Sequence, residues 1–418
     1  MPPFKKKTQQ EQAVNEINPA SVSSDMSDDF SADLIRQLNK ESGEQIAFNL
    51  GTDDAPTNIK RWISTGSKQL DYVISNRRNG GLPEGRIIEI QGPPSCGKSH
   101  IAFEIAKSTQ KMGGLVVYID TENATSLDNL KQLGIDVAHR FVFVQTGCTE
   151  EVFKVAEAAI MKSRASTKDV PVTIIWDSVA ASAPQAELTG EYTDNTIGLQ
   201  ARVLGKGLRK IANIIANQKV LFVLLNQQRQ KIGVMYGDPT TTPGGMAIPY
   251  AASTRIRIST GAPVKVGKDQ VIGIEVDAKT IKNKVAKPFR VATFQIHFGR
   301  GVIEHEQVFD FLRTYCEVQP GKCIKHNGMQ IAVQGTGAWK TFTVVDDKTG
   351  EVIVEEKFYK PDFGTRVLYN PVHKEQVDAL MDAAYIMNAA NMDHPTFAGV
   401  DTSSAVEQEA LKAERGVE

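Results

Sequence analysis

The sequence predicts an α/β fold in which a mostly parallel sheet, with helices on both faces, continues into antiparallel strands. Five short apolar segments alternate with helical patterns between residues 87 and 226. The first segment leads directly into Gly92-Pro93-Pro94-Ser95-Cys96-Gly97-Lys98-Ser99, and a helical pattern follows it. From about Thr254, strand patterns succeed one another with no helix between them. Strands that alternate with helices are typical of parallel sheets covered on both faces.

Hydrophobic periodicity gives the individual elements. The predicted strands of the parallel part are residues 87–91, 115–120, 141–145, 172–177 and 220–226, and its predicted helices are residues 101–111, 127–133, 150–163 and 199–217. The antiparallel part is predicted at residues 255–259, 274–281 and 291–298. After Gly301 we expect a small α+β section, with helices at 308–315 and 374–387 and strands at 340–345 and 351–358.

Ahead of this core lies a short arm. Phe30, Leu34, Ile35 and Leu38 predict an amphipathic helix, and residues 46–50 predict a lone strand. These two elements cannot bury their own apolar faces, so they pack either on a neighbouring subunit or on the same chain. We therefore expect five parts: a disordered polar tail (1–29), the arm (30–62), the core (63–301), a C-terminal domain (302–392) and an acidic disordered tail (393–418).

The composition is that of an ordinary globular protein. The 418 residues are 41% hydrophobic and 23% charged, with a formal net charge of -1. Binding to nucleic acid would therefore depend on a local basic stripe or on repeated assembly. We expect no membrane span, because no apolar run is long enough, and no signal peptide, because no apolar stretch follows the lysines at 5–7. The four scattered cysteines indicate a reducing, cytoplasmic location. Cys316, Cys323 and His326 match no standard zinc spacing.

The segment Gly92–Ser99 satisfies the phosphate-loop pattern G-x-x-x-x-G-K-[ST] at every fixed position. Its glycines allow successive backbone N–H groups to converge on a phosphate, and the following helix adds a favourable dipole. Lys98 is placed to reach the terminal phosphates, and the Ser99 hydroxyl to hold Mg²⁺. The cofactors predicted from this segment are ATP and Mg²⁺.

Two further strands end in acidic residues. Asp177 ends the 172–177 strand, at the edge where open α/β sheets bind ligands, and it is a candidate for the Mg²⁺ site or a turn aspartate. Glu122 follows the 115–120 strand and is placed to orient an attacking water, unless it is only a solvated acid. Asp120 is a weaker candidate for the same role.

The fifth strand ends in Asn226 and Gln227, and an unusual loop follows it. A neutral amide there can contact the γ-phosphate and report nucleotide state to residues 229–245. A loop of this length with so little apolar periodicity is either functional or disordered. Its Arg229, Lys231 and backbone amides suit a phosphate backbone.

Other basic residues have two possible explanations. Arg202, Lys206 and Arg209 share one face of the 199–217 helix, behind an acidic loop at 188–197, and such a stripe is often only solvated. The lysines at positions 279, 282, 284 and 287 either protect an exposed strand edge or reach across a subunit boundary to a nucleotide.

Several segments together resemble the RecA/UvsX family of bacterial and phage recombinases, most closely from residue 64 to 301. The resemblance is carried by Thr65-Gly66-Ser67-Lys68-Gln69-Leu70-Asp71, by Gly80-Gly81-Leu82-Pro83-Glu84-Gly85-Arg86-Ile87, by the phosphate loop, by Trp176-Asp177-Ser178-Val179-Ala180-Ala181 and by Lys282-Asn283-Lys284. The run Lys231-Ile232-Gly233-Val234-Met235 and the pair Gly244-Gly245 are the most specific. Past Gly301 the likeness weakens, and the Gly337-Ala338-Trp339 patch is more similar to the phage branch.

The resemblance implies a RecA-like, DNA-dependent ATPase that forms helical filaments on single-stranded DNA and exchanges strands with a homologous duplex. By motif position, residues 92–99 and Asp177 would bind ATP and Mg²⁺, Glu122 would position water, and Gln227 would couple nucleotide to DNA. Arg202, Arg209, Arg229, Lys231, Gly244 and Gly245 would contact DNA, with 188–197 and 229–245 as the two DNA loops. Lys282 and Lys284 would act on the neighbour's ATP, and the arm would be the oligomerisation element. Single-strand-binding and mediator proteins are implied partners.

Three positions depart from the bacterial pattern. Asn129 stands where an aromatic stacks on adenine, and Pro249 stands where an interface lysine is usual. Cys96 replaces a small polar residue, which suggests thiol-sensitive activity. Two alternative functions stay open: a ring-forming motor of the helicase type, and a nucleotide-regulated DNA-binding scaffold that hydrolyses little ATP.

Overall fold

The computed structural model describes residues 24–53, 55–166, 169–191, 196, 198–230, 240–267, 269–317, 324–326, 328–335 and 337–386. The chain divides into two compact units, residues 1–58 and 59–418. No helix in the described ranges is long and apolar enough to cross a membrane. The expected tails at 1–29 and 393–418 lie largely or wholly outside these ranges.

The first unit is built on helix α1 (Ser24–Ser42), which is longer than predicted. Phe30, Leu34 and Leu38 are exposed on this helix. The predicted strand at residues 46–50 is wrong for this structure. The Asn39 side chain instead accepts hydrogen bonds from the backbone N–H groups of Ile46 and Ala47, at 2.8 Å each. Among residues 24–53 and 55–58, no strand lies beside this segment, so it has no partner there with which to form a ladder.

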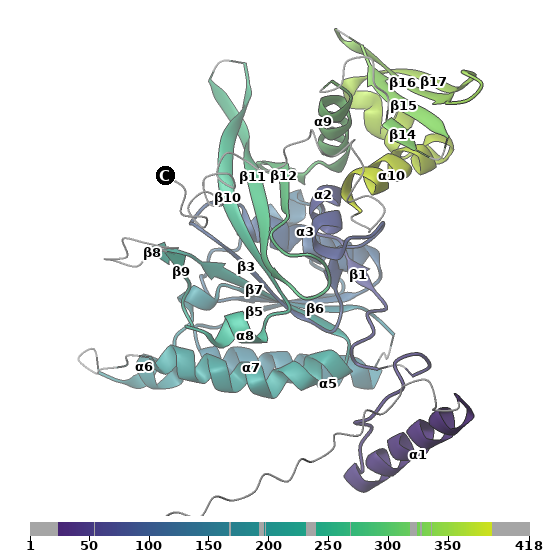
Figure 1. Cartoon of the computed structure of the whole chain (residues 1–418). Helices are drawn as coiled ribbons and strands as arrows, with labels where there is room; N and C mark the ends of the chain where they lie inside the picture. Colours follow the sequence, from purple (N-terminus) through teal and green to yellow (C-terminus); the bar gives the residue numbers. More distant parts are fainter. Residues whose placement is uncertain are drawn as a thin grey trace, which may run out of the picture. The chain divides into compact units, whose positions relative to one another are not determined.

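The second unit contains the predicted sheet (Figure 1). Its nine strands lie in the order β13-β12-β11-β10-β3-β7-β6-β4-β5. The parallel strands are β3 (Ile87–Gly92), β4 (Leu115–Asp120), β5 (Phe141–Gln145), β6 (Val172–Asp177) and β7 (Val220–Gln227). The extension comprises β10 (Thr254–Val266), parallel to β3, and antiparallel β11 (Gln270–Asn283), β12 (Val291–His297) and β13 (Gly301–Val302). The predicted α/β class with an antiparallel extension is confirmed.

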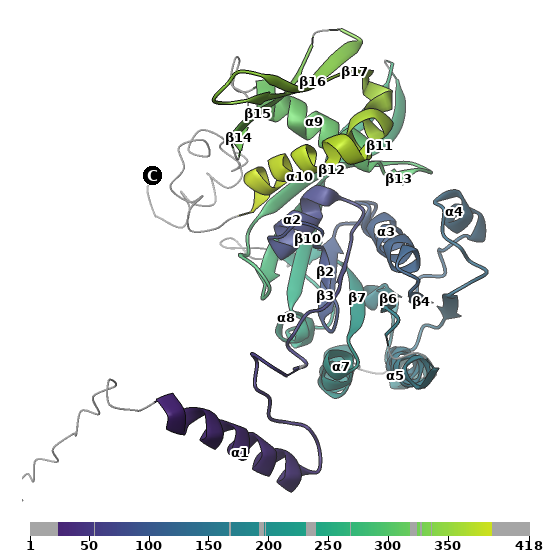
Figure 2. The ribbon, with the colours of Figure 1, turned by 90° about the vertical axis from the view of Figure 1, so that its right-hand side faces the viewer.

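Helices cover both faces of the parallel strands (Figure 2). One face carries α2 (Lys68–Ser75), α3 (Lys98–Lys111) and α4 (Leu127–Gln132), and the other carries α5 (Thr149–Ser166), α7 (Leu199–Asn217) and α8 (Ala247–Ala251). Each face has its own core, because successive strand side chains point to opposite sides. Ile90 and Ile105 lie in the first core, and Trp176 and Leu208 lie in the second.

Several short elements were not predicted. They include β1 (Trp62–Ile63) and β2 (Leu82–Pro83), helices α2, α6 (Gln185–Thr189) and α8, the 3₁₀ turn Val179–Ala181, the pair β8 (Arg229–Gln230) and β9 (Thr240–Thr241), and strand β13. In the C-terminal region, residues 324–326 and 329–334 also form strands that were not predicted. Helix α2 begins after Ser67, whose side chain accepts a hydrogen bond from the N–H of Leu70 at 3.4 Å. Eight residues are too few for a strong helical period in the sequence.

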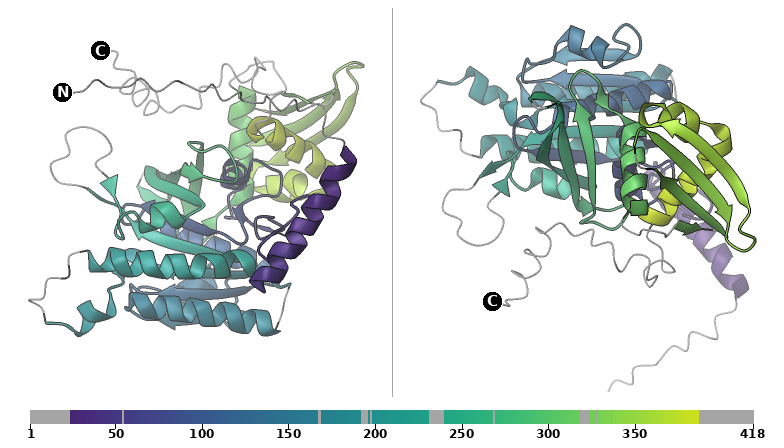
Figure 3. Two further views of the ribbon diagram at one scale, coloured as in Figure 1. Left: turned by 60° about the horizontal axis from the view of Figure 1, so that its bottom comes forward. Right: turned by 90° about the horizontal axis from the view of Figure 1, so that it is seen from above.

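The C-terminal region forms a second, antiparallel sheet with helices against it (Figure 3). Its strands β14 (Ile324–His326), β15 (Met329–Gln334), β16 (Trp339–Asp346) and β17 (Val352–Tyr359) pair in sequence order. Its helices are α9 (Glu304–Glu317) and α10 (Pro371–Tyr385), with the 3₁₀ turn Lys360–Asp362 and the π-helical turn Gly364–Leu368 between β17 and α10. The phenylalanines at 309, 342, 358 and 363 form its buried centre.

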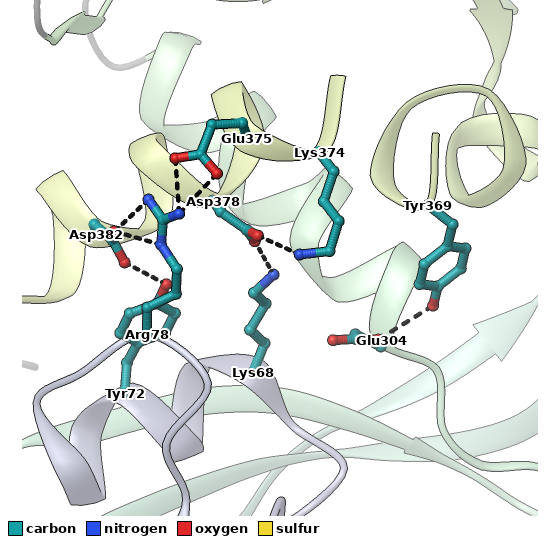
Figure 4. A network of polar contacts seen from close by, with 9 residues as sticks. All are labelled: Lys68, Tyr72, Arg78, Glu304, Tyr369, Lys374, Glu375, Asp378 and Asp382. Carbon is teal, nitrogen blue, oxygen red and sulfur yellow. Dashed lines mark hydrogen bonds and ion pairs between the residues drawn. The ribbon is translucent and has the colours of Figure 1, made fainter. Parts of the chain in front are cut away.

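Charged contacts join α10 to the segment that contains α2 (Figure 4). Asp378 accepts from Lys68 and from Lys374, and the Tyr72 hydroxyl donates to Asp382 at 2.6 Å. Arg78 donates to Asp382 at 2.7 Å and to Glu375 at 2.8 Å. Asp378 is almost fully buried. This part of the junction therefore depends on ion pairs as well as on apolar packing.

Candidate functional site

The phosphate loop connects the carboxyl end of β3 to the first turn of α3. Gly97 has a φ of +94°, and a side chain on it would lie 2.6 Å from Ile296 Cδ1. A side chain on Gly92 would lie 2.6 Å from the carbonyl oxygen of Ile258. Glycine is therefore required at both positions, since neither has room for a Cβ and the first also has a left-handed backbone.

Lys98 lies inside this loop, and its side chain is nearly buried. Its Nζ donates to the carbonyl oxygens of Gly92 at 3.2 Å and Pro93 at 2.6 Å. Phosphate oxygens carry more negative charge than carbonyls and accept stronger hydrogen bonds from an ammonium group. The lysine is thus held where a phosphate entering the loop would meet it.

Ser99 and Asp177 meet at the point where α3 begins and β6 ends. The Ser99 hydroxyl donates to Asp177 Oδ2 at 2.8 Å, and the Tyr118 hydroxyl donates to the same oxygen at 2.6 Å. Burial raises the pKa of Asp177, and these two hydrogen bonds oppose the rise. A hydroxyl and a carboxylate are oxygen donors of the kind Mg²⁺ prefers.

The pair Ser99 and Asp177 suits Mg²⁺ better than a metal ion whose ligands all come from protein side chains. In the described part of the chain, no group of three or more histidine, cysteine, aspartate or glutamate side chains is placed to hold a metal ion. Mg²⁺ at nucleotide sites is commonly bound through one or two protein ligands, with phosphate oxygens and waters completing the shell. The expectation that Cys316, Cys323 and His326 form no zinc site stays untested, because Cys323 lies outside the described residues.

Asp120 and Glu122, both near the end of β4, have different environments. The Asp120 carboxylate accepts hydrogen bonds from the backbone N–H groups of Glu122, Asn123 and Thr125, at 2.9, 2.9 and 3.0 Å. Its oxygens therefore hold the turn after β4. Glu122 is exposed, and its Oε1 accepts from the Ser178 hydroxyl and from Gln227 Nε2, the latter at 2.9 Å. Of the two acids, only Glu122 presents its carboxylate to the open end of the sheet.

A buried polar cluster beneath Gln227 was not foreseen. Glu89 Oε1 accepts from Asn226 Nδ2 at 3.0 Å, and Glu89 Oε2 accepts from Arg255 Nε at 2.5 Å. Asn226 Nδ2 also donates to the carbonyl oxygen of Pro243 at 3.3 Å. One amide thus joins the phosphate-loop strand to the far end of the 229–245 segment. The signal in the sequence was a lone glutamate inside an apolar strand.

The candidate DNA-contacting residues lie beyond the carboxyl end of β7 and along α7. A side chain on Gly244 would lie 2.7 Å from Leu204 Cδ1, and one on Gly245 would lie 3.5 Å from Ala201 Cβ. The glycine pair therefore packs on the amino-terminal half of α7, where Arg202 is exposed. Arg209, further along the helix, and Arg229, in β8, are exposed too. Lys231, half of the candidate DNA loop at 188–197 (residues 192–195 and 197) and most of the one at 229–245 (residues 231–239) lie outside the described residues.

Lys282 and Lys284 do not reach the phosphate loop of their own chain. Lys282 Nζ donates to the carbonyl oxygens of Pro249 at 2.6 Å and Tyr250 at 3.4 Å. The N–H of Lys284 bonds to Ser253, whose own N–H bonds to Ile87 at the start of β3. Both lysines therefore lie toward the opposite end of the parallel strands. Burial lowers the pKa of Lys282, and the nearby Lys284 and Arg255 lower it further.

The three departures from the bacterial pattern have different surroundings. The Cys96 thiol is buried, and burial raises its pKa, although Lys98 opposes this. A buried, protonated thiol reacts slowly, so the structure argues against the expected thiol sensitivity. Pro249 contributes its carbonyl to Lys282. Asn129 is half-buried on α4.

These features define a class of protein. A glycine loop around a lysine, followed by a hydroxyl–carboxylate pair at the carboxyl ends of parallel strands, belongs to the P-loop nucleoside triphosphatases. Residues 31–303 match the family described as RecA N-terminal domain. The chain belongs to the RecA family, the ATP-binding recombinases of homologous recombination and DNA repair, which bind single-stranded DNA and form filaments on it.

Individual relatives extend this similarity over most of the chain. Protein RecA of Geobacter sulfurreducens is 39% identical over 276 residues, which cover 66% of this chain and 78% of the relative. Protein RecA of Chloroherpeton thalassium is 37% identical over 317 residues, which cover 76% of this chain and 80% of the relative. Protein RecA of Sulfurimonas denitrificans is 35% identical over 361 residues, which cover 86% of this chain and 95% of the relative.

Proposed function

We propose that this chain polymerises on single-stranded DNA into a helical filament, pairs that strand with a homologous duplex, and hydrolyses ATP when DNA is bound. The observation that carries the proposal is the 2.9 Å hydrogen bond between Gln227 and Glu122. Glu122 is the candidate for the group that orients water, and Gln227 opens the segment that leads into the second DNA loop. One contact thus links the hydrolytic position to the DNA-binding segment.

At the nucleotide site, each residue has a distinct role. The backbone N–H groups of residues 92–99 and the Lys98 ammonium bind the phosphates. Ser99 and Asp177 hold Mg²⁺, which when bound offsets the negative charge of the phosphates. The Glu122 carboxylate accepts a hydrogen bond from the attacking water and takes its proton. Gln227 contacts the γ-phosphate when ATP is present, and this contact competes with its bond to Glu122.

The DNA surface combines the glycine pair with the basic residues around it. Arg202, Arg209 and Arg229 neutralise phosphates of the bound strand, while Gly244 and Gly245 allow the backbone to approach it closely. Lys231 and the loop at 188–197 extend this surface. One subunit offers few cations, so affinity comes from many subunits that add their contacts along one strand.

Neighbouring subunits complete the site. Lys282 and Lys284 lie far from their own phosphate loop, and we assign them to the ATP of the adjacent subunit. The arm at residues 30–62, with its exposed Phe30, Leu34 and Leu38, docks on the next core in the filament. The core (63–301) carries the chemistry, and the C-terminal domain (302–392) is joined to it. Single-strand-binding and mediator proteins act as loading partners.

The test is ATP hydrolysis titrated with single-stranded DNA, with strand exchange measured in parallel. Wild-type protein should hydrolyse ATP faster as DNA is added, and Lys98→Ala should abolish ATP-driven strand exchange. Undiminished exchange by Lys98→Ala would contradict the site assignment. Closed rings in electron micrographs would favour the helicase-type motor. DNA binding with negligible hydrolysis at any DNA concentration would favour the scaffold.

A further inference from the structure

We propose that Tyr118 is a positioning residue that fixes the orientation of the Asp177 carboxylate at the metal side of the nucleotide site. This inference rests on the proposed assignment of Asp177 to Mg²⁺. Tyr118 lies in β4, which is paired with β6 so that Tyr118 is opposite Ile175 and Asp120 is opposite Asp177. From two residues before the strand end, its hydroxyl donates to Asp177 Oδ2 at 2.6 Å.

Tyr118 cannot easily move its hydroxyl away from Asp177. Its side chain is fully buried, and its ring stacks on those of Phe103, Phe141 and Phe143, with centroids 5.5, 6.2 and 6.3 Å away. A tyrosine in such surroundings keeps one rotamer, because protein interiors are close-packed. A buried hydroxyl without a partner is costly, so the bond to Asp177 is maintained.

The two donors to Asp177 differ in their tasks. Ser99 contacts the same oxygen at 2.8 Å, but its hydroxyl is also the expected metal ligand. Tyr118 has no place at the open face of the site and serves only to orient. Both donors contact Oδ2, and no donor in the described part of the chain contacts Oδ1. The carboxylate is thereby held at one oxygen and left available at the other.

Loss of the phenol hydroxyl should therefore weaken metal binding more than it weakens the fold. The terminal torsion of aspartate is broad, so a carboxylate with one donor samples more orientations than one with two. Removing a group that orients a metal ligand typically lowers metal affinity 10- to 100-fold. Phenylalanine at this position keeps the ring stack and removes one oxygen atom.

The experiment uses the full chain and a fluorescent ATP analogue whose binding is titrated with Mg²⁺. Tyr118→Phe should raise the Mg²⁺ concentration for half-maximal binding about 10-fold, and binding without Mg²⁺ should not change. The matched control is Tyr72→Phe, which removes another tyrosine hydroxyl that donates to a carboxylate, that of Asp382 at 2.6 Å, at the α10 junction. This control should leave the Mg²⁺ curve unchanged.

Four outcomes decide the matter. A Tyr118→Phe curve that coincides with the wild-type curve would overturn the inference. So would a loss of nucleotide binding that is uniform across all Mg²⁺ concentrations, because a purely structural role predicts it. In an Asp177→Asn background, the Tyr118 change should add no further shift, and an independent shift would also overturn the inference. If wild-type protein binds the analogue without regard to Mg²⁺, the metal assignment itself fails and the inference fails with it.

Discussion

Replacing Glu122 by glutamine should stop ATP turnover while leaving ATP and DNA binding intact. The structure separates two contributions to this effect. Glutamine keeps an oxygen that can accept from Gln227 and Ser178, so the local contacts are largely preserved, and a neutral hydrogen bond is worth only about 1 kcal/mol. Loss of the base should lower the rate of ATP hydrolysis about 10²- to 10⁴-fold, which corresponds to a rise of about 3–5 kcal/mol in the activation free energy. The chemical contribution therefore dominates.

The assay is steady-state ATP hydrolysis at saturating single-stranded DNA, with nucleotide and DNA affinities measured on the same protein. Asp120→Asn is an informative comparison, because Asp120 holds three backbone N–H groups of the adjoining turn. This second variant should lose stability as well as activity. Hydrolysis by Glu122→Gln within tenfold of wild type would refute the reasoning. Loss of ATP binding in parallel with turnover would make Glu122 a binding group instead.

Three further predictions follow from the described contacts. Gly244→Ala should weaken single-stranded DNA binding several-fold with ATP affinity unchanged, since its Cβ would lie 2.7 Å from Leu204 Cδ1. The control is Gly267→Ala, at a glycine with similar backbone geometry and no atom within 4 Å, and equal losses of DNA affinity in the two variants would contradict the prediction. Asp378→Asn should lower the free energy of unfolding by about 3 kcal/mol, because it leaves the nearly buried Lys68 unpaired. Glu375→Gln, at an exposed ion pair, should lower it by less than about 1 kcal/mol. Chemical denaturation measures both losses, and similar values would contradict the role assigned to the buried ion pair. Burial raises the pKa of Asp71 to about 7, so its contribution to stability is greatest below about pH 4 and is lost as pH rises toward 7. Asp71→Asn should flatten this part of the pH–stability curve, and an unchanged slope would refute the prediction.

The sequence was most informative where one physical signal dominated. The strands Leu115–Asp120, Phe141–Gln145 and Val172–Asp177 and the helix Leu199–Asn217 have the predicted ends, because uninterrupted apolar runs or regular helical spacing mark them. The phosphate loop was predicted because its spacing is diagnostic. The segment at 46–50 failed because its apolar residues indicate a strand but say nothing of a partner.

The hydrogen-bond partners of individual side chains could not be predicted from the sequence. Asp120 and Glu122 are two residues apart and chemically alike, and only the backbone N–H groups around Asp120 distinguish them. Tyr118 was part of an apolar strand, and its hydrogen bond to Asp177 depends on the pairing of β4 with β6. The cluster of Glu89, Asn226 and Arg255 joins residues 137 and 166 positions apart. Such contacts follow from topology, which local periodicity does not encode.

The central claim is that ATP held between adjoining subunits organises a surface for a single DNA strand. Analytical sedimentation of the full chain with a long single-stranded oligonucleotide, with and without a slowly hydrolysed ATP analogue, tests it most directly. The account predicts large cooperative complexes only when both the nucleotide and the DNA are present. Protein that stays monomeric on the oligonucleotide, whichever nucleotide is supplied, would contradict it.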